Sequence, residues 1–304
     1  YMPIFEEALD AYGLPLELRY LPIIESALNP SAVSRAGASG LWQFMIGTGK
    51  IYGLESNSLV DERRDPIKAT WAAARYLKEM YDIYGDWNLV IAAYNCGPGT
   101  INKAIRRANG ETDYWKIYNY LPKETRGYVP AFIAANYVMT YYCDHNICPM
   151  ETNIPASTDT VQVNKNLHFE QIADLCNVPL DQIKSLNPQY KKHMIPGDSK
   201  PYTLRLPIDA ISTFIDKQDT IYAHRADELF RNRKTVAVKE ITPSTRKTTA
   251  AVAGKGKLTY YTIKSGDTLS TIAGKYGVTI KDIQRWNGMS NTKIAAGKRL
   301  KIYK

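Results

Sequence analysis

One carboxylic acid stands alone among apolar residues near the start of the sequence. The segment "LPIIESALNP" covers residues 21–30, and Glu25 is its only ionisable group. If the segment is a helix, Leu21 and Leu28 lie four positions before and three positions after Glu25 along one face. Such burial disfavours the charged carboxylate and raises its pKa. An acid that stays protonated near neutral pH can act as a general acid, so Glu25 is the leading catalytic candidate.

Other acids are weaker candidates because the sequence supplies partners for them. Asp61, Glu62 and Asp65 lie in "DERRDP", beside Arg63 and Arg64. Adjacent opposite charges favour structural ion pairs for these three carboxylates rather than a role in catalysis.

The four cysteines indicate no metal chemistry. Cys143 and Cys148 flank "DHNI" and could close a small disulfide loop, whereas Cys96 and Cys176 are isolated. No CxxC pair and no His/Cys cluster at metal-ligand spacing occurs. We therefore expect neither a metal nor a cofactor.

Composition and charge limit the classes of function. The chain has 304 residues, enough for about two domains, and its 44% hydrophobic and 23% charged residues are ordinary for a soluble globular protein. Without a run of about 18 apolar residues, we expect no membrane-spanning segment. Residues 231–304 hold 17 Lys and Arg against three acids, whereas residues 1–230 carry a net charge of −5. The basic end is either attracted to a polyanion or a solvated linker.

The first 142 residues are predicted to be almost entirely helical. "DPIKATWAAARYLKEMYDIYG" (65–85) repeats apolar residues at helical spacing, with Pro66 near its start and Gly85 just past its end. "ETRGYVPAFIAANYVMTYY" (124–142) is a second such run, interrupted only by Pro130. We expect one mostly α-helical domain over residues 1–148, large enough to bury its own core.

Two later segments, residues 158–208 and 257–304, share a plan of strand, helix, helix and strand. Each ends in a Pro- or Gly-containing loop and a strand, "IPGDSKPYTLRLP" in the first and "IAAGKRLKIYK" in the second. This is the pattern of an internal repeat. The helices are expected at 169–175 and 180–186 in the first segment, and at 269–276 and 280–286 in the second.

Between the two repeats, residues 209–256 are predicted to be a basic linker with one short helix at 227–231. The expected fold class is therefore multidomain α and α+β, with a helical domain followed by two small βααβ modules.

Four motifs in order carry a family resemblance: "ES" (25–26), "GLWQF" (40–44), "AYNCGPG" (93–99) and "ETRGYV" (124–129). Through them, residues 1 to about 142 resemble the lytic transglycosylase domain of the goose-type-lysozyme-like fold. Residues 258–304 resemble a LysM module through "YTIKSGDTLSTIA" and "IQRWNG". Residues 161–207 are similar but degenerate, with "NKNLHF" in place of the "GDTL" turn.

The resemblance implies a substrate and a reaction. The substrate would be peptidoglycan, cut at the β-1,4 bond between N-acetylmuramic acid and N-acetylglucosamine. The 6-hydroxyl of the muramic acid attacks its own C1 and leaves a 1,6-anhydro sugar. Glu25 would first protonate the leaving 4-oxygen and then accept the proton of the 6-hydroxyl. A tethered nucleophile has a high effective concentration, so the second carboxylate of most glycosidases is not required.

The resemblance also implies a set of polar residues around Glu25. Ser34 and Ser39 would hydrogen-bond Glu25 or an N-acetyl group, or else serve loop and capping chemistry. Glu124 either supports the site or merely begins a helix, and Trp42 replaces the more common Met, which puts the floor of the sugar site in doubt. The expected substrate-binding residues are Ser26, Ser34, Ser39, Gln43, Tyr94, Asn95 and Tyr128.

In the LysM-like modules, the resemblance places the glycan-binding surface on the loops between strands and helices. Asp267 is equally a candidate helix cap. The expected contacts of the C-terminal module with N-acetylglucosamine are Gly266, Asp267, Thr268, Leu269, Asn291 and Ile294.

Two other functions stay open. A hydrolytic lysozyme or chitinase on the same fold would need a second carboxylate or a positioned water, and a non-catalytic peptidoglycan-binding scaffold would need only the modules. We expect no nucleic-acid partner, since no recognition motif accompanies the basic tail. We expect a monomer in the bacterial envelope, on the periplasmic side, and leave open a lipid anchor on a missing N-terminal segment.

Overall fold

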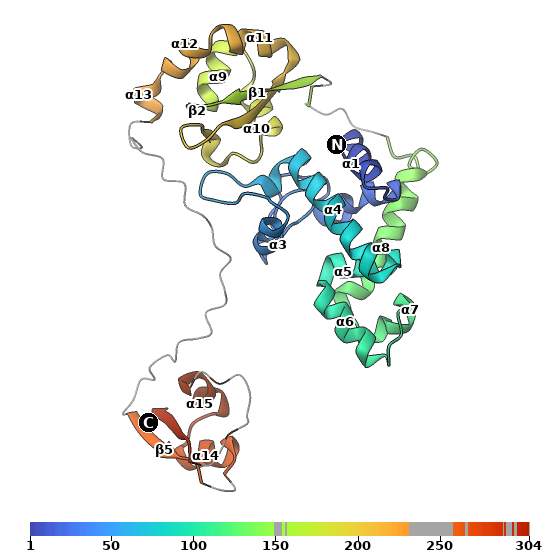
Figure 1. The fold of residues 1–304 in the computed structure, drawn as a ribbon, viewed down its shortest axis with the longest axis vertical. Coiled ribbons are helices and arrows are strands. Elements are labelled where there is room, and N and C mark those ends of the chain that lie inside the picture. The colour runs from blue at the N-terminus through green and yellow to red at the C-terminus, as the bar shows by residue number, and fades with distance from the viewer. Residues whose placement is uncertain are drawn as a thin grey trace. The chain divides into compact units, whose positions relative to one another are not determined.

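The chain divides into two compact units, Tyr1–Thr242 and Pro243–Lys304. The first contains a helical domain and the first module, and the second contains the C-terminal module (Figure 1). This computed structural model describes residues 1–148, 154–155, 157–230, 258–264, 267–287, 289, 294 and 297–303.

The helical domain confirms the fold class expected for the first 148 residues. Its 3-10 helices are η1 (Leu16–Tyr20), η2 (Glu62–Arg64) and η3 (Tyr118–Tyr120). Its α-helices are α1 (Met2–Ala11), α2 (Leu21–Ser26), α3 (Ile46–Ile51), α4 (Pro66–Tyr84), α5 (Trp87–Cys96), α6 (Pro98–Arg107), α7 (Tyr114–Ile117) and α8 (Lys123–Thr140).

Helix α4 forms where its apolar spacing and end signals predict. Asp65 caps it by accepting hydrogen bonds from the amides of Ile67 and Lys68, and Pro66 occupies the first turn. It ends at Gly85, whose φ of 63° suits a residue without a Cβ. One face of α4 packs with α1 and α5 in the core, so the helices that flank the candidate site rest on a continuous apolar centre.

The first module is built on two antiparallel strand pairs. Strands β1 (Thr158–Val163) and β4 (Tyr202–Pro207) pair along their full length, and β2 (Asn166–His168) pairs with β3 (Met194–Pro196). Helices α9 (Phe169–Cys176) and α10 (Leu180–Leu186) lie between them in sequence, with the short 3-10 helix η4 (Lys191–His193) before β3.

Residues after β4, expected as the start of a linker, belong instead to this module. Residues 208–229 form α11 (Ile208–Asp216), α12 (Gln218–Ala223) and α13 (Ala226–Leu229). Ala210, Phe214 and Ile221 are buried in the module's core. The apolar residues of this stretch are spaced as in helices. The sequence analysis missed this pattern because the many polar residues suggested a linker. The remainder of the expected linker, 231–256, lies outside the described residues.

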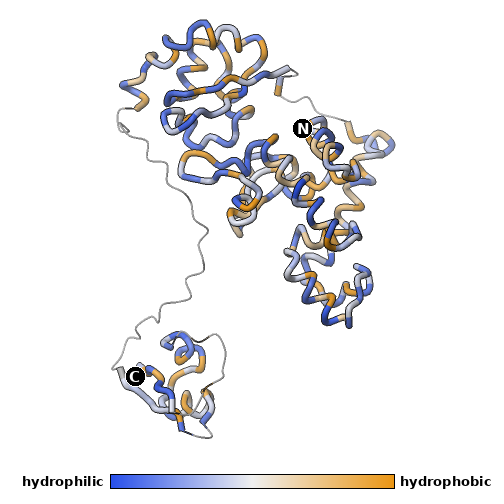
Figure 2. The backbone as a smooth tube through the Cα atoms, in the orientation of Figure 1, coloured by the Kyte–Doolittle hydropathy of each residue, from blue (hydrophilic) through white to orange (hydrophobic). Residues whose placement is uncertain are grey.

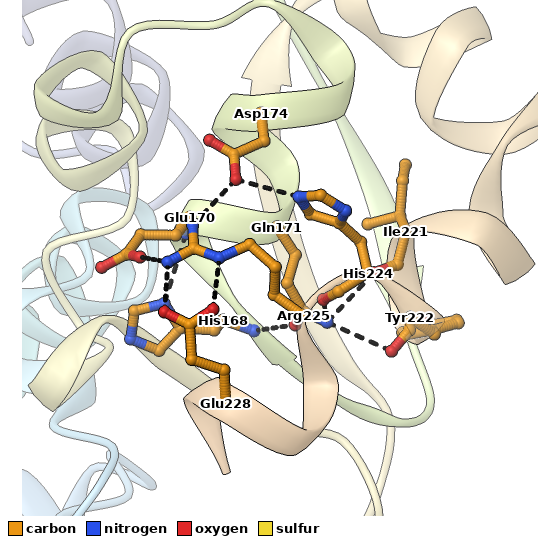
Figure 3. Close-up of polar contacts among 9 residues, drawn as sticks. All are labelled: His168, Glu170, Gln171, Asp174, Ile221, Tyr222, His224, Arg225 and Glu228. Atoms are coloured by element: carbon orange, nitrogen blue, oxygen red, sulfur yellow. Dashed lines mark hydrogen bonds and ion pairs between the residues drawn. The ribbon is translucent and has the colours of Figure 1, made fainter. Parts of the chain in front are cut away.

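Polar contacts tie this extension to α9, as Figure 3 shows. The buried side-chain amide of Gln171 donates to three backbone carbonyl oxygens, those of Ile221, Tyr222 and His224. The guanidinium of Arg225 pairs with three carboxylates, those of Glu170, Asp174 and Glu228. The three helices are therefore attached to the module by burial and by hydrogen bonds.

The second unit repeats the βααβ plan. Strand β5 (Leu258–Thr262) pairs antiparallel with β6 (Arg299–Tyr303), and α14 (Leu269–Tyr276) and α15 (Ile280–Asn287) lie between them in sequence. Leu269, Ile283 and Trp286 are among the residues buried in its own core. The unit thus has what it needs to fold by itself.

The pattern of hydropathy along the chain is typical of a protein in which each helix buries one apolar face and not its whole length. Apolar positions alternate with hydrophilic ones along the helices of both units (Figure 2). Within the described part of the chain, no helix combines the length and the apolar character needed to cross a membrane. Cys143 and Cys148, considered for a disulfide, are both exposed free thiols in this structure.

Candidate active site

Glu25 lies in the last turn of α2. The helix ends at Ser26, and Ala27 and Leu28 follow with φ angles of 50° and 59°. Leu28 therefore does not lie on the helix face where the sequence pattern placed it. Leu21 is fully buried, and both Ile24 and Leu28 still pack on the core, so Glu25 is nevertheless held against an apolar surface.

The environment of Glu25 favours its protonated form. Burial is the main cause that raises its pKa to about 7, and the charge of Glu124 raises it further. The hydroxyl of Tyr128 donates a hydrogen bond to Oε1 of Glu25, which opposes this shift by stabilising the carboxylate. A carboxyl group that titrates near 7 can both donate and accept a proton at neutral pH.

Tyr128 and Glu124 reach Glu25 from α8. Glu124 lies in the first turn of this helix and is exposed, and Tyr128 follows one turn later. Both expectations for Glu124 therefore fit its position: it begins a helix, and its charge acts on Glu25.

Residues 37–44, here called loop 37–44, lie against the end of α2 that carries Glu25 and against α5. Ser26, next to Glu25, has its hydroxyl 2.9 Å from the carbonyl oxygen of Leu41. The hydroxyl of Tyr94 on α5 donates to the carbonyl oxygen of Trp42 at 2.7 Å. Burial and the negative charge of Glu25 raise the pKa of Tyr94, which keeps this hydroxyl a donor. The motif residues of three separate segments thus meet around one carboxyl group.

A close backbone contact explains the glycine of "GLWQF". Gly40 has a φ of 90°, and a Cβ there would lie 1.7 Å from the carbonyl oxygen of Arg63. Only glycine tolerates both this conformation and this approach.

Three side chains of this region form hydrogen bonds that hold the loops, two of them with backbone groups and one with the side chain of Arg64. The hydroxyl of Ser34 accepts from the amide of Ala38, the fully buried hydroxyl of Ser39 accepts from Arg64, and the amide nitrogen of Gln43 donates to the carbonyl oxygen of Gly40 at 2.8 Å. In this conformation Ser34 and Ser39 serve the loop rather than Glu25, whereas the carbonyl end of the Gln43 side chain can face a ligand. Their contacts with substrate stay predictions.

Trp42 does not form the floor of the sugar site. Its ring is fully buried, packs edge-on against Phe5, and donates from Nε1 to Thr70 at 2.9 Å. The doubt that its replacement of Met raised is therefore resolved in favour of a core position, and only its backbone carbonyl takes part in the site.

Asn95 is held in a defined orientation. Its Oδ1 accepts a hydrogen bond from Thr125 at 2.9 Å, and the residue is half-buried at the end of α5. The amide N–H groups are then what the side chain can offer to an acetamido carbonyl, so its contact with substrate remains a prediction.

The rival carboxylates are engaged in structural roles. Asp61 is bound by Arg63 through two hydrogen bonds of 2.8 Å, Glu62 pairs with Lys68, and Asp65 caps α4. Within the described part of the chain, no group of three or more His, Cys, Asp or Glu side chains is arranged to hold a metal ion.

In the C-terminal module, Asp267 and Thr268, which are expected to contact glycan, form hydrogen bonds within the module itself. Thr268, not Asp267, caps α14, while Asp267 accepts from Tyr261 and from the amide of Lys264, each at 2.8 Å. Leu269 is 2% exposed and packs in the core, which removes its side chain from the expected glycan contacts. Ile294 packs partly against the same core, and Gly266 and Asn291 lie outside the described residues.

Three families of known domains match parts of the chain. Residues 2–117 match the family described as Transglycosylase SLT domain, residues 157–223 match "Lytic transglycosylase MltD, LysM-like domain", and residues 261–302 match LysM domain. The chain carries an SLT domain followed by two LysM-type domains. The sequence resemblance is thereby confirmed, and the span of the LysM-like match includes α11 and α12.

Relatives of the SLT domain and of the whole chain point the same way. The chain is 33% identical to membrane-bound lytic murein transglycosylase D of Escherichia coli strain K12, over 95% of this chain and 60% of that protein. It is 33% identical to the soluble lytic murein transglycosylase of the same strain, over 39% of this chain and 19% of that one. The chain thus spans about 60% of the length of the transglycosylase D that it matches.

Among solved structures, the 70 kDa soluble lytic transglycosylase of Escherichia coli aligns with a TM-score of 0.41 and 29% identity. The alignment covers 47% of this chain and 24% of that one.

One group of residues around the SLT site was missed by the sequence analysis. Arg63 and Arg64 were assigned to ion pairs with neighbouring acids, yet both also hold loop 37–44, Arg63 through the carbonyl oxygens of Gly37 and Phe44 and Arg64 through Ser39. Nothing in the local spacing connects "RR" to "GLWQF", because the contacts join residues 19 to 26 positions apart, with α3 between them.

Proposed function

We propose that this protein is a peptidoglycan lytic transglycosylase, a carbon–oxygen lyase that cleaves the β-1,4 bond between N-acetylmuramic acid and N-acetylglucosamine. The observation that carries the proposal is the carboxyl group of Glu25, whose pKa is raised to about 7 beside the hydroxyl of Tyr128. The names of the relatives, both of them lytic murein transglycosylases, support the same activity.

In the first step Glu25 donates its proton to the 4-oxygen of the leaving N-acetylglucosamine while the bond from C1 to that oxygen breaks. Burial favours this step because it keeps the carboxyl group protonated near neutral pH. The positive charge that develops at C1 is then close to a newly formed carboxylate.

In the second step the 6-hydroxyl of the same muramic acid attacks C1, and its proton passes to the Glu25 carboxylate. A bond from C1 to O6 replaces the bond that was broken, and no water is consumed. Glu25 returns to its protonated state. Tyr128 assists here, because its hydrogen bond stabilises the carboxylate that must exist between the two steps.

The polar groups around Glu25 suit an N-acetylated sugar. Asn95 offers amide N–H groups, and Gln43, within loop 37–44, offers a side-chain carbonyl. We assign both to substrate binding, together with Tyr94, which fixes the position of the Trp42 carbonyl. Ser26 and Ser34 shape the walls of the site through backbone contacts, and Ser39 does so through the side chain of Arg64.

The C-terminal LysM module would attach the enzyme to its polymer. A weak sugar contact gains from linkage to a catalytic domain, since the second contact becomes intramolecular. Peptidoglycan strands are then the partner, and the bacterial envelope, on the periplasmic side, is the compartment.

Mass analysis of digested peptidoglycan tests the activity. The expected products end in 1,6-anhydro-N-acetylmuramic acid, and in water enriched in ¹⁸O they carry no label. Reducing ends that are one water heavier and carry ¹⁸O would replace this proposal with a hydrolytic lysozyme or chitinase. No cleavage, with intact binding to peptidoglycan, would indicate a non-catalytic scaffold.

A further inference from the structure

A loop of the SLT domain is built into the core of the LysM-like module. This loop, residues 55–64, carries Leu59 and Val60, which are 2% and 1% exposed and pack within the module's apolar cluster. Val60 also forms an antiparallel bridge with Tyr190. Two apolar side chains removed from water in this way fix the loop on the module.

Polar contacts continue this attachment and centre on Lys191. Its backbone amide donates to the carbonyl oxygen of Leu59 at 2.6 Å, and its ammonium donates to the carbonyl oxygen of Asn57 at 2.9 Å. The same ammonium lies 3.5 Å from Oδ2 of Asp61. Lys191 is thus a residue of the module whose charge faces a buried acid of the SLT domain.

Asp61 passes this contact on to Arg63. The two form a fork of two hydrogen bonds, each 2.8 Å long, and are 1% and 5% exposed. Burial alone would raise the pKa of Asp61, but Arg63 and Lys191 hold it below its usual range. Buried charges of this kind require their partners, so the three groups form one unit.

Arg63 in turn holds both ends of loop 37–44. Its Nη1 donates to the carbonyl oxygen of Gly37 and to that of Phe44, each at 2.9 Å. Between these two ends, the carbonyl oxygen of Leu41 in the loop accepts a hydrogen bond from Ser26 on α2, the helix that carries Glu25. A continuous series of contacts therefore runs from the module to the wall of the candidate active site.

In the LysM-like module, contacts within the chain hold the two loops by which a LysM domain would contact a glycan. Strands β2 and β3 pair those two loops with each other, and a Cβ on Gly197 would lie 2.2 Å from the carbonyl oxygen of Lys165. The second loop also carries Gln189, whose carbonyl accepts from the amide of Asp61 at 2.9 Å. Both loops are thus already engaged by the chain itself.

We propose that the LysM-like module is a brace for the active site and that Lys191 is a positioning residue for loop 37–44, acting through Asp61 and Arg63. The ammonium and Arg63 share Oδ2 of Asp61, so the position of the carboxylate depends on both. Loss of the ammonium lets the Asp61–Arg63 pair shift and releases the ends of the loop. The inference rests on the proposed function only in taking loop 37–44 as a wall of the sugar site.

The test compares four variants of the full chain with the wild type. Lys191→Met removes the ammonium and keeps the apolar stem. Lys192→Met makes the same change at an exposed neighbour, and Lys200→Met removes a different ion pair of the same interface, the 2.7 Å contact with Glu55. Lys191→Arg retains a cation and serves as the rescue. Amide hydrogen exchange by mass spectrometry and steady-state kinetics on a soluble peptidoglycan fragment are measured for each.

Lys191→Met is expected to speed exchange in residues 37–44 by about tenfold, because hydrogen bonds to charged groups are among the stronger ones. KM should rise several-fold, with the pH dependence that reports on Glu25 unchanged. Lys192→Met and Lys200→Met should leave exchange in residues 37–44 as in the wild type, and Lys191→Arg should largely restore it.

Unchanged exchange in residues 37–44 of Lys191→Met would overturn the proposal. An equal rise in exchange throughout α4 and α5 would also overturn it, because that would indicate general destabilisation. An equal effect of Lys200→Met on exchange in residues 37–44 would overturn it as well, because any weakening of the interface would then explain the result without a special role for Lys191. If the wild-type protein cleaves no peptidoglycan, the proposed function fails, but the exchange measurements still decide whether Lys191 positions the loop.

Discussion

The hydroxyl of Tyr128 donates a hydrogen bond to Oε1 of Glu25 across 103 positions of sequence. This contact opposes the effect of burial on Glu25, and Glu124, one turn earlier on the same helix, acts in the other direction. Helix α8 thus carries two groups that adjust the pKa of one acid in opposite senses, which makes their effects separable.

Replacement of Tyr128 by Phe should shift the pH dependence of the reaction upward. The hydrogen bond favours the carboxylate, so its loss raises the pKa of Glu25, and the fall of kcat/KM at high pH moves to higher pH. The maximal rate should drop by about tenfold, because the carboxylate formed between the two steps loses a charge-assisted hydrogen bond. Tyr137→Phe, an exposed position on the same helix, is the matched control. A pH profile identical to wild type would contradict this role of Tyr128.

Replacement of Glu124 by Gln should shift the same limb downward. Its negative charge disfavours ionisation of Glu25, so removing it lowers the pKa of that acid. Because Glu124 is exposed, salt screens this interaction, and the shift should shrink as ionic strength rises. The measurement is kcat/KM against pH at low and high salt. An upward shift, or one that salt does not reduce, would mean that Glu124 acts through structure and not through charge.

Glu25→Gln should abolish turnover, since general acid–base catalysis contributes about 10²- to 10⁴-fold in typical enzymes. Retention of more than about a tenth of the wild-type rate would assign the acid elsewhere. The anhydro product of the wild type, followed by mass analysis, is the readout.

The same variant should be more stable than the wild type at high pH. In the folded protein the pKa of Glu25 rises from 4.5 to about 7, so between these values the folded state keeps a proton that the unfolded chain has released. Stability is therefore lost as pH rises through this window. Gln does not ionise, so Glu25→Gln should gain on the order of 2 kcal/mol at pH 8 and nothing at pH 4, by denaturant unfolding. An equal gain at both pH values would exclude ionisation as its cause.

How far the sequence predicts the structure depends on how local the cause is. Apolar spacing, Pro66 and Gly85 predict α4 almost to the residue, because the caps act within one turn. The acid of the site was predictable from its apolar neighbours, although Leu28 lies beyond the helix end. The docking of Leu59 and Val60 into the module was not, because their partners lie more than a hundred positions away. The single local indication of this docking is that two apolar residues, Leu59 and Val60, stand together between Ser58 and Asp61.

The C-terminal unit offers a test of attachment that leaves the chemistry intact. Deletion of residues 258–304 removes a unit with its own core, so cleavage of short soluble fragments should be unchanged. Binding to insoluble peptidoglycan should weaken. Part of the attraction should be electrostatic, since residues 231–304 hold 17 Lys and Arg against three acids. This part should fall with salt, because the Debye length shrinks from about 10 Å at 0.1 M to about 3 Å at 1 M.

Sugar contacts made by the LysM module should survive that screening, so a pull-down across a salt series separates the two contributions. With the module present, binding should decline with salt to a plateau above zero; without it, binding should decline further, to the level that the catalytic domain provides. The matched variant is Lys275→Ala together with Lys281→Ala, which lowers the charge of the module and keeps its core. This variant should lose binding at low salt and match the wild type at 1 M. Binding that the deletion leaves unchanged at every salt concentration would show that the C-terminal module is not the tether.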